Sequence, residues 1–117
     1  MFHYAQIGQT EYVFIPPSSL SDETREYLRA RSRGLFGNLD RLEVAAAIAA
    51  SPDGVVNATD LQWELRIANN RVRAQLVAFV DLGFLQPVST EARKRYYVRL
   101  ESPFWATCLE LYGQWSQ

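Results

Sequence analysis

The stretch of the chain with the most specific chemistry is "RIANNRVRAQL", residues 66–76. The amides of Asn and Gln can pair with adenine, and the guanidinium of Arg can pair with guanine. In a helix, Val72 and Leu76 would face the core and the polar residues would lie on the exposed side. The candidates for contacts to base edges are Asn69, Asn70, Arg71, Arg73 and Gln75. The alternative is that they form an ordinary solvated helix face.

Positive charge is concentrated in the part of the chain that contains this stretch. Residues 66–99 hold six Arg and one Lys against two acidic residues, although the net charge of all 117 residues is −1. The sequence pI of about 5.8 is lower than that expected of a nucleic-acid binder, so the uneven distribution predicts only a local basic surface. The cations suited to phosphate contacts are Arg66, Arg93, Lys94, Arg95 and Arg99. The alternative for residues 93–95 is a solvated hairpin tip, where charges are favoured anyway.

Hydrophobic periodicity and capping residues predict the elements that position these side chains. Val72, Leu76, Phe79 and Val80 follow a helical repeat that ends at Gly83. Before this helix we expect an extended arm at 11–17, a helix from Ser21 to Gly34, a helix after Asn38 and a short helix capped by Asn57 or Thr59. After it we expect two strands around a polar tip and a last helix that begins at Ser102 and Pro103.

This order of elements is that of a winged helix-turn-helix. Residues 55–100 closely resemble the DNA-binding core of MarR- and ArsR-like bacterial transcriptional regulators. The matching features are Leu61 and Leu65 in the first helix of the motif, Val72 and Leu76 in the second, the helix end "LVAFVDLGFL" and the return strand of the wing, "RKRYYVRL". The resemblance implies a mostly α-helical, α+β fold with a small hairpin in a single domain, residues 1–117. Its parts would be an N-terminal arm and helix (1–37), a winged-helix core (38–100) and a C-terminal helix (101–117).

The resemblance also implies a function. Proteins of this class place the second helix of the motif in the major groove and the wing on the phosphate backbone, and they bind paired half-sites as dimers. We therefore expect sequence-specific binding of double-stranded DNA by a homodimeric bacterial transcriptional regulator. The alternative is a winged-helix module that binds proteins and not DNA, because the same fold also serves protein–protein contacts and the chain is acidic overall.

The last helix has two adjacent apolar faces, which is more than it needs to pack against one neighbour. Such a helix can cover its own core and also meet a second subunit. The residues expected at a dimer interface are Phe104, Trp105, Cys108, Leu109, Tyr112 and Trp115. The alternative is a single helix packed across its own domain.

Catalysis, metal binding and membrane insertion have little support in the sequence. The chain has one His and one Cys, so one subunit cannot supply a cluster of such metal ligands, and no nucleophile motif or phosphate loop is present. We expect a protein that is not an enzyme and carries no cofactor. A single thiol, no secretory signal and no long apolar run favour a cytoplasmic location. A small-molecule effector could bind between the aromatic-rich ends, but nothing in the sequence identifies one.

Overall fold

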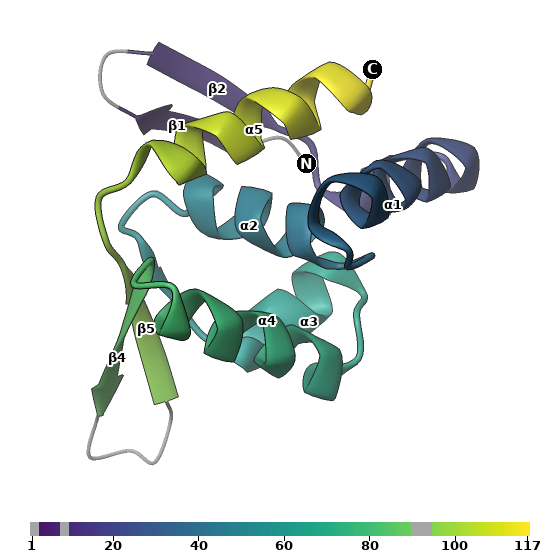
Figure 1. Ribbon diagram of the computed structural model, residues 1–117. Coiled ribbons are helices and arrows are strands. Elements are labelled where there is room, and N and C mark those ends of the chain that lie inside the picture. The colour runs from purple at the N-terminus through teal and green to yellow at the C-terminus, as the bar shows by residue number, and fades with distance from the viewer. Residues whose placement is uncertain (1–2, 8–9, 90–94) are drawn as a thin grey trace.

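Apart from an additional strand and a short 3-10 helix near the N-terminus, the helices and strands of the computed structural model follow the order expected from the sequence (Figure 1). The structure describes residues 3–7, 10–89 and 95–117. Its elements are β1 (His3–Ile7), β2 (Thr10–Phe14), a 3-10 helix (Pro17–Ser19), α1 (Asp22–Phe36), α2 (Arg41–Ala50), β3 (Val55–Val56), α3 (Ala58–Leu65), α4 (Asn69–Asp81), β4 (Leu85–Ser89), β5 (Arg95–Arg99) and α5 (Pro103–Trp115). The predicted winged helix-turn-helix is confirmed, with α3 and α4 as its two helices and β4 and β5 as its wing.

Short polar side chains begin three of the helices at the expected positions. Ser21 accepts a hydrogen bond from the backbone N–H of Thr24, and Asn57 accepts one from the backbone N–H of Asp60. Ser102 caps α5 in a similar way. These caps satisfy backbone donors that have no partner within the helix, and so they fix where each helix starts.

Two helix boundaries differ from the prediction. Helix α1 does not end at Gly34 but continues to Phe36, and Gly37 ends it in the left-handed conformation with φ of 72°. A glycine inside a helix costs only about 1 kcal/mol relative to alanine, so Gly34 alone does not stop the helix. Helix α2 starts after Asp40 and not after Asn38, whose side chain instead accepts from the backbone N–H of Asp40.

Helix α2 lies at the centre of the molecule. In Figure 1 it runs between α5 and the β1–β2 hairpin on one side and α3 and α4 on the other. All residues from Leu42 to Ala50 are buried, and most of them are alanines. Small side chains let the neighbouring elements approach closely on every side. The core is therefore built around a helix that is covered along nearly its whole length.

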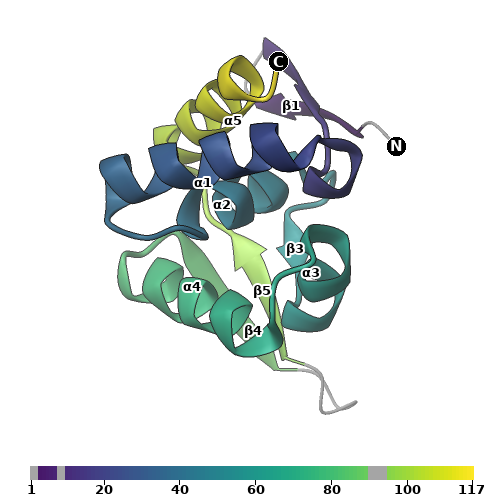
Figure 2. The ribbon, with the colours of Figure 1, turned by 90° about the vertical axis from the view of Figure 1, so that its right-hand side faces the viewer.

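The wing belongs to a three-stranded antiparallel sheet. Strand β5 lies in the middle, between β3 and β4. Val55 of β3 lies opposite Val98, and Leu85 of β4 lies opposite Arg99. In Figure 2, β4 and β5 extend past α3 and α4 and away from α5 and β1. The wing and the helix-turn-helix therefore share one end of the molecule.

The N-terminal arm forms a second sheet, which the sequence predicted only in part. Strands β1 and β2 pair in antiparallel register from His3 opposite Phe14 to Ile7 opposite Thr10. Only residues 11–17 were expected to be extended, because small and polar residues interrupt the apolar pattern of residues 3–7. Phe14 stacks on Tyr112 of α5 with ring centroids 4.9 Å apart. The hairpin thus covers part of the outer side of the core.

Helix α5 packs across its own domain. Four of its predicted dimer residues, Trp105, Cys108, Leu109 and Tyr112, are buried within the monomer. The indole N–H of Trp105 and the hydroxyl of Tyr112 also donate hydrogen bonds to backbone carbonyls of the same chain. The expectation that these four residues meet a second subunit is wrong, because they already fill the core between α2 and β2. The other two, Phe104 and Trp115, are only partly buried.

A buried carboxylate links α1, α2 and α3. Glu43 is fully buried, and its Oε2 accepts a hydrogen bond from Arg25 Nε at 3.0 Å. Arg25 also donates to the backbone carbonyl of Leu65, at the end of α3. Glu43 Oε1 has no hydrogen-bond partner among the residues that the structure describes. Burial raises the pKa of Glu43 above its ordinary value of 4.5, although the Arg25 charge acts in the opposite direction.

Replacing Leu109 with Asp should prevent folding, and not merely separate subunits. The new carboxylate would be buried in an apolar core without a partner, at a cost of about 4 kcal/mol or more, which is a large part of the stability of a small domain. Circular dichroism during a urea titration would measure the loss, with Glu110→Lys on the exposed side of the same helix as the control. A folded Leu109→Asp protein of half the wild-type mass in light scattering would contradict this and support a dimer contact at α5.

The raised pKa of Glu43 predicts a pH dependence of stability. A group whose folded-state pKa is raised contributes stability that is present below its ordinary pKa of 4.5 and is lost as pH rises through the folded-state pKa. Gln at position 43 cannot ionise, so the variant does not lose this stability as pH rises. The free energy of unfolding of Glu43→Gln minus that of the wild type should therefore be larger at about pH 7 than at about pH 4. Urea midpoints at the two pH values measure this difference. An equal difference at both would show that Glu43 does not titrate as its burial requires.

Candidate nucleic-acid interface

The exposed side of α4 begins directly after the turn of the helix-turn-helix. Val72 and Leu76 are buried in the core, whereas Asn70, Arg73 and Ala74 are exposed. The amphipathic pattern expected of this helix is therefore confirmed. Its polar side can meet a partner without disturbing the core.

A basic groove lies between the start of α3, the start of α4 and strand β5. The residues that line it are Asn57, Ala58, Thr59, Asn69, Arg73, Arg95 and Tyr97, and its volume is about 320 Å³. Two guanidinium groups face this space, from Arg73 and Arg95. Asn57 is the N-cap of α3, so the positive end of that helix dipole also lies there. The groove can hold an anionic group such as a phosphate.

The groove brings together three residues that were predicted to contact DNA and others that were not. Asn69, Arg73 and Arg95 were expected to contact bases or phosphates, and they lie together. Thr59 and Tyr97 were not predicted to contact DNA; Thr59 was expected only as an alternative cap of the first helix of the motif, a position that Asn57 occupies. The amide of Asn69 also donates to Gln62 Oε1 at 3.0 Å, which ties the two helices together.

Arg71 points away from this groove toward the start of α2. Its Nε donates to Asp40 Oδ2 at 2.9 Å, and its Nη2 donates to Oδ1 of the same carboxylate. Asp40 also lies 3.5 Å from Arg29 of α1. The hydrogen bonds to Asp40 raise the pKa of Arg71. A bidentate ion pair of this kind holds the guanidinium in place within the chain, so Arg71 is less available to bases than its sequence position indicates.

Gln75 is not a surface residue, so the expectation that it contacts bases is wrong. It is 2% exposed, and its Oε1 accepts from Arg41 Nε at 3.0 Å. Its amide nitrogen donates to Asn38 Oδ1 at 2.9 Å. Gln75 therefore joins α4 to the start of α2. The sequence could not show this, because both partners lie more than thirty residues away.

Arg99 caps α2, and its predicted place on the phosphate backbone is also wrong. Its Nη1 donates to the carbonyl oxygens of Ile48, Ala49 and Ser51 at 2.9, 2.7 and 3.1 Å. These are the unpaired carbonyls at the C-terminal end of the helix, where a cation is favoured. Burial lowers the pKa of Arg99. The basic residues of 66–99 thus include one that stabilises the fold.

The remaining predicted cations lie apart from the groove or outside the described residues. Arg66 is exposed at the end of α3 with φ of 54°. It borders a shallow surface hollow together with Trp63, whose side chain is 74% exposed. Arg93 and Lys94 fall on residues that the structure does not describe, so their phosphate contacts stay predictions.

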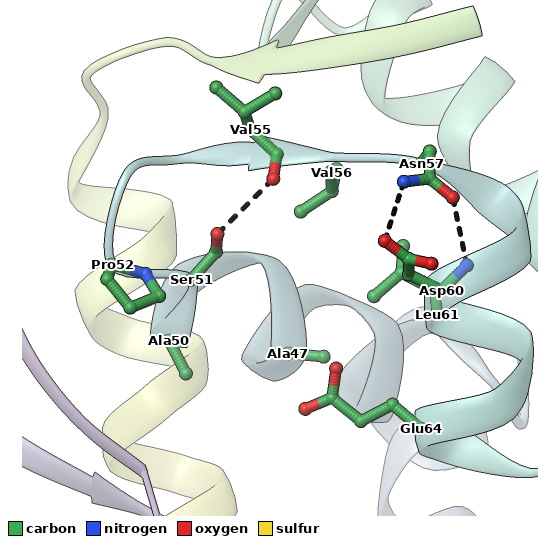
Figure 3. Close-up of a pocket in the computed structure, with 10 residues that line it drawn as sticks. All are labelled: Ala47, Ala50, Ser51, Pro52, Val55, Val56, Asn57, Asp60, Leu61 and Glu64. Atoms are coloured by element: carbon green, nitrogen blue, oxygen red, sulfur yellow. Dashed lines mark hydrogen bonds between the residues drawn. The ribbon is translucent and has the colours of Figure 1, made fainter. Parts of the chain in front are cut away.

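A second hollow, of about 180 Å³, opens between α2, β3 and α3 and has acidic walls. Figure 3 shows Asp60 and Glu64 of α3 on one side of it and Ala47 of α2 beneath. Asn57 donates to Asp60 Oδ2 at 2.8 Å. These carboxylates would repel a nucleic-acid backbone, so this hollow is not part of the basic surface.

The structure also bears on the reactivity of the cysteine and on metal binding. Cys108 is buried, and burial raises the pKa of its thiol to about 12, so the reactive thiolate is strongly disfavoured. The described residues contain no group of three or more His, Cys, Asp or Glu side chains that could hold a metal ion. No helix in this part of the chain has the length and apolar character needed to cross a membrane.

The helices, the wing and the basic groove define a winged helix-turn-helix protein. Among solved structures, the chain is similar to MepR, a transcription regulator of the Staphylococcus aureus multidrug efflux pump MepA. The TM-score is 0.60 at 8% sequence identity, over 79% of this chain and 70% of the MepR chain. MepR has a MarR-family fold, so the resemblance seen in the sequence is confirmed for the fold. No protein-family model and no curated protein sequence matches the chain.

Arg99 caps α2 whereas Arg95 is exposed, so their replacement should affect the stability of the fold differently. Arg99→Met should lower the free energy of unfolding by about 2–3 kcal/mol, because three helix-end carbonyls lose a charged donor. Arg95→Met, at an exposed position of the same strand, should change it by less than about 0.5 kcal/mol. Urea titrations of both variants measure the difference. Equal stabilities would show that the cap on α2 is unimportant.

Proposed function

We propose that this chain is a transcriptional regulator that binds double-stranded DNA in a sequence-specific manner, with α4 in the major groove and the wing on the phosphate backbone. The observation that carries the proposal is the basic groove, in which Arg73 and Arg95 share one surface of a winged-helix fold. MepR, which has a similar fold, is a transcription regulator.

Asn70 and Arg73 are the residues that would contact bases. Both are exposed on α4. An α-helix is about 10–12 Å across, which matches the width of the major groove, and Asn pairs with adenine as Arg pairs with guanine. Arg71 forms an ion pair with Asp40, and Gln75 is buried. These two residues would therefore fix the position of α4 and would not contact bases. Asn69 is half-buried at the start of α4, beside the residues proposed to contact bases.

Phosphate contacts would come from the groove and the wing. Arg95 is exposed beside the start of α3, and both the cation and the helix dipole attract a negative group. Arg93 and Lys94 would extend this contact along the wing. Such contacts provide affinity that depends on salt and carry little sequence information.

A regulator of paired half-sites also needs a second subunit. The buried side of α5 cannot provide the contact, so we place it on the outer side of α1 and the end of α5. Tyr27 and Leu35 of α1 are exposed apolar side chains. Arg31 lies 5.3 Å from the ring of Trp115, which is partly exposed. This surface combines aromatic rings and an Arg, the residue types enriched at protein interfaces.

The alternative is a winged-helix module that binds proteins. One observation favours it: Asp40 neutralises a cation of α4, so the basic surface is smaller than the sequence predicts. Arg73 and Arg95, in contrast, form no ion pair with another described residue. The two functions differ in whether the protein prefers one duplex sequence.

Binding of a selected duplex and of a scrambled duplex across a salt series tests the proposal. Arg73→Ala should relax the preference at particular base pairs, at a cost of about 1–3 kcal/mol for a lost base contact. Arg95→Ala should weaken binding to both duplexes alike and reduce the salt slope by about one unit.

Glu101→Gln, at an exposed position between the wing and α5 and outside the groove, is the control and should bind like the wild type. If selection from random DNA yields no preferred sequence, the protein is not a sequence-specific regulator. If the Arg73 variant keeps the full preference of the wild type, α4 is not the reading helix.

A further inference from the structure

Val77 is an apolar side chain in the middle of the exposed side of α4. It is 55% exposed, one helical turn beyond Arg73. Asn70, Ala74 and Val77 follow the i, i+4, i+7 spacing of one helix face, so Val77 shares the face proposed to read bases. The other side of α4 is fully occupied by the core, so the exposed position of Val77 is not needed for packing.

The surroundings of Val77 connect it with the basic groove. It borders a hollow of about 310 Å³ between α4 and the wing, together with Val80, Asp81, Pro87, Arg95 and Tyr97. Arg95 and Tyr97 also line the basic groove, so the two hollows form one continuous surface. A ligand that places an anion in the groove would therefore present its neighbouring part to Val77.

In the major groove, the apolar feature that a base presents is the C5 methyl group of thymine. We propose that Val77 contacts this methyl group, so that the preferred duplex contains a T·A pair close to the base that Arg73 contacts. The inference rests on the proposed binding of DNA. Four residues of helix rise by about 6 Å and successive bases by about 3.4 Å, which places the thymine within about two base pairs of the Arg73 contact.

Two neighbouring residues support this assignment. Ala74 carries only a methyl group on the same face, so it does not hold the helix away from the bases. Asp81, one turn beyond Val77, is exposed and would repel phosphates. The surface of α4 suited to DNA therefore extends from Asn70 to Val77, and Val77 is the largest apolar side chain within it.

Deoxyuridine in place of thymine tests the contact, because it removes only the C5 methyl group. In the selected duplex, each thymine is replaced in turn and the dissociation constant is measured for the wild type. One replacement near the Arg73 contact should weaken binding about fourfold, the effect of exposing one methyl-sized group. Val77→Ala should bind the thymine duplex with a similar loss and should not distinguish thymine from deoxyuridine at that position.

Leu82→Ala is the matched control, because Leu82 is an exposed apolar residue that follows α4 but borders neither hollow. It should keep the wild-type response to deoxyuridine. The inference is overturned if no replacement weakens binding, if Val77→Ala responds as the wild type does, or if the selected site has no thymine within two base pairs of the Arg73 contact. In these cases specific binding remains and only the role of Val77 fails, whereas the absence of any preferred duplex would overturn the proposed function as well.

Discussion

The rest of the structure depends on the interactions of charged side chains at the two ends of α2. At its start, Asp40 pairs with Arg71 of α4 and lies close to Arg29 of α1. At its end, Arg99 of β5 donates to three carbonyls. A negative group at the start and a positive group at the end both suit the helix dipole. The central helix is thus bound at one end to the helix proposed to read DNA and at the other end to the wing.

This arrangement explains why the basic surface is smaller than the charge of residues 66–99 indicates. Two of the arginines in that segment stabilise the fold, one by an ion pair and one by a helix cap. A partly buried arginine needs partners for its donors, and α2 supplies them at both ends. What remains for an anionic partner among the described residues of the groove is Arg73 and Arg95. The modest surface agrees with the low pI of the chain.

The sequence predicted the fold well because the relevant signals are local. The helical repeat of Val72 and Leu76 and the caps at Ser21, Asn57 and Ser102 each depend on residues within a turn or two. The site was harder to predict because an arginine or glutamine on a helix can turn toward solvent or toward a distant partner. Gln75 and Arg99 have partners on α2 and in the loops at its two ends, and no local pattern encodes those contacts. The same holds for α5, whose two apolar faces fit either a second subunit or the core that it covers.

The contact between Tyr112 and Ile15 has a consequence for the folding kinetics of this domain. Their hydrogen bond joins residues 97 positions apart, and β2 packs along α5 around it. Helical domains usually fold quickly because most of their contacts are local, whereas contacts between distant segments require the entropy of a long loop to be lost first. The packing of β2 against α5 should therefore form late, after α2 has packed against the elements that lie closer to it in the sequence. Until then, one side of the alanine-rich central helix is open to water, and the rate of the last step is set by how often two remote segments meet.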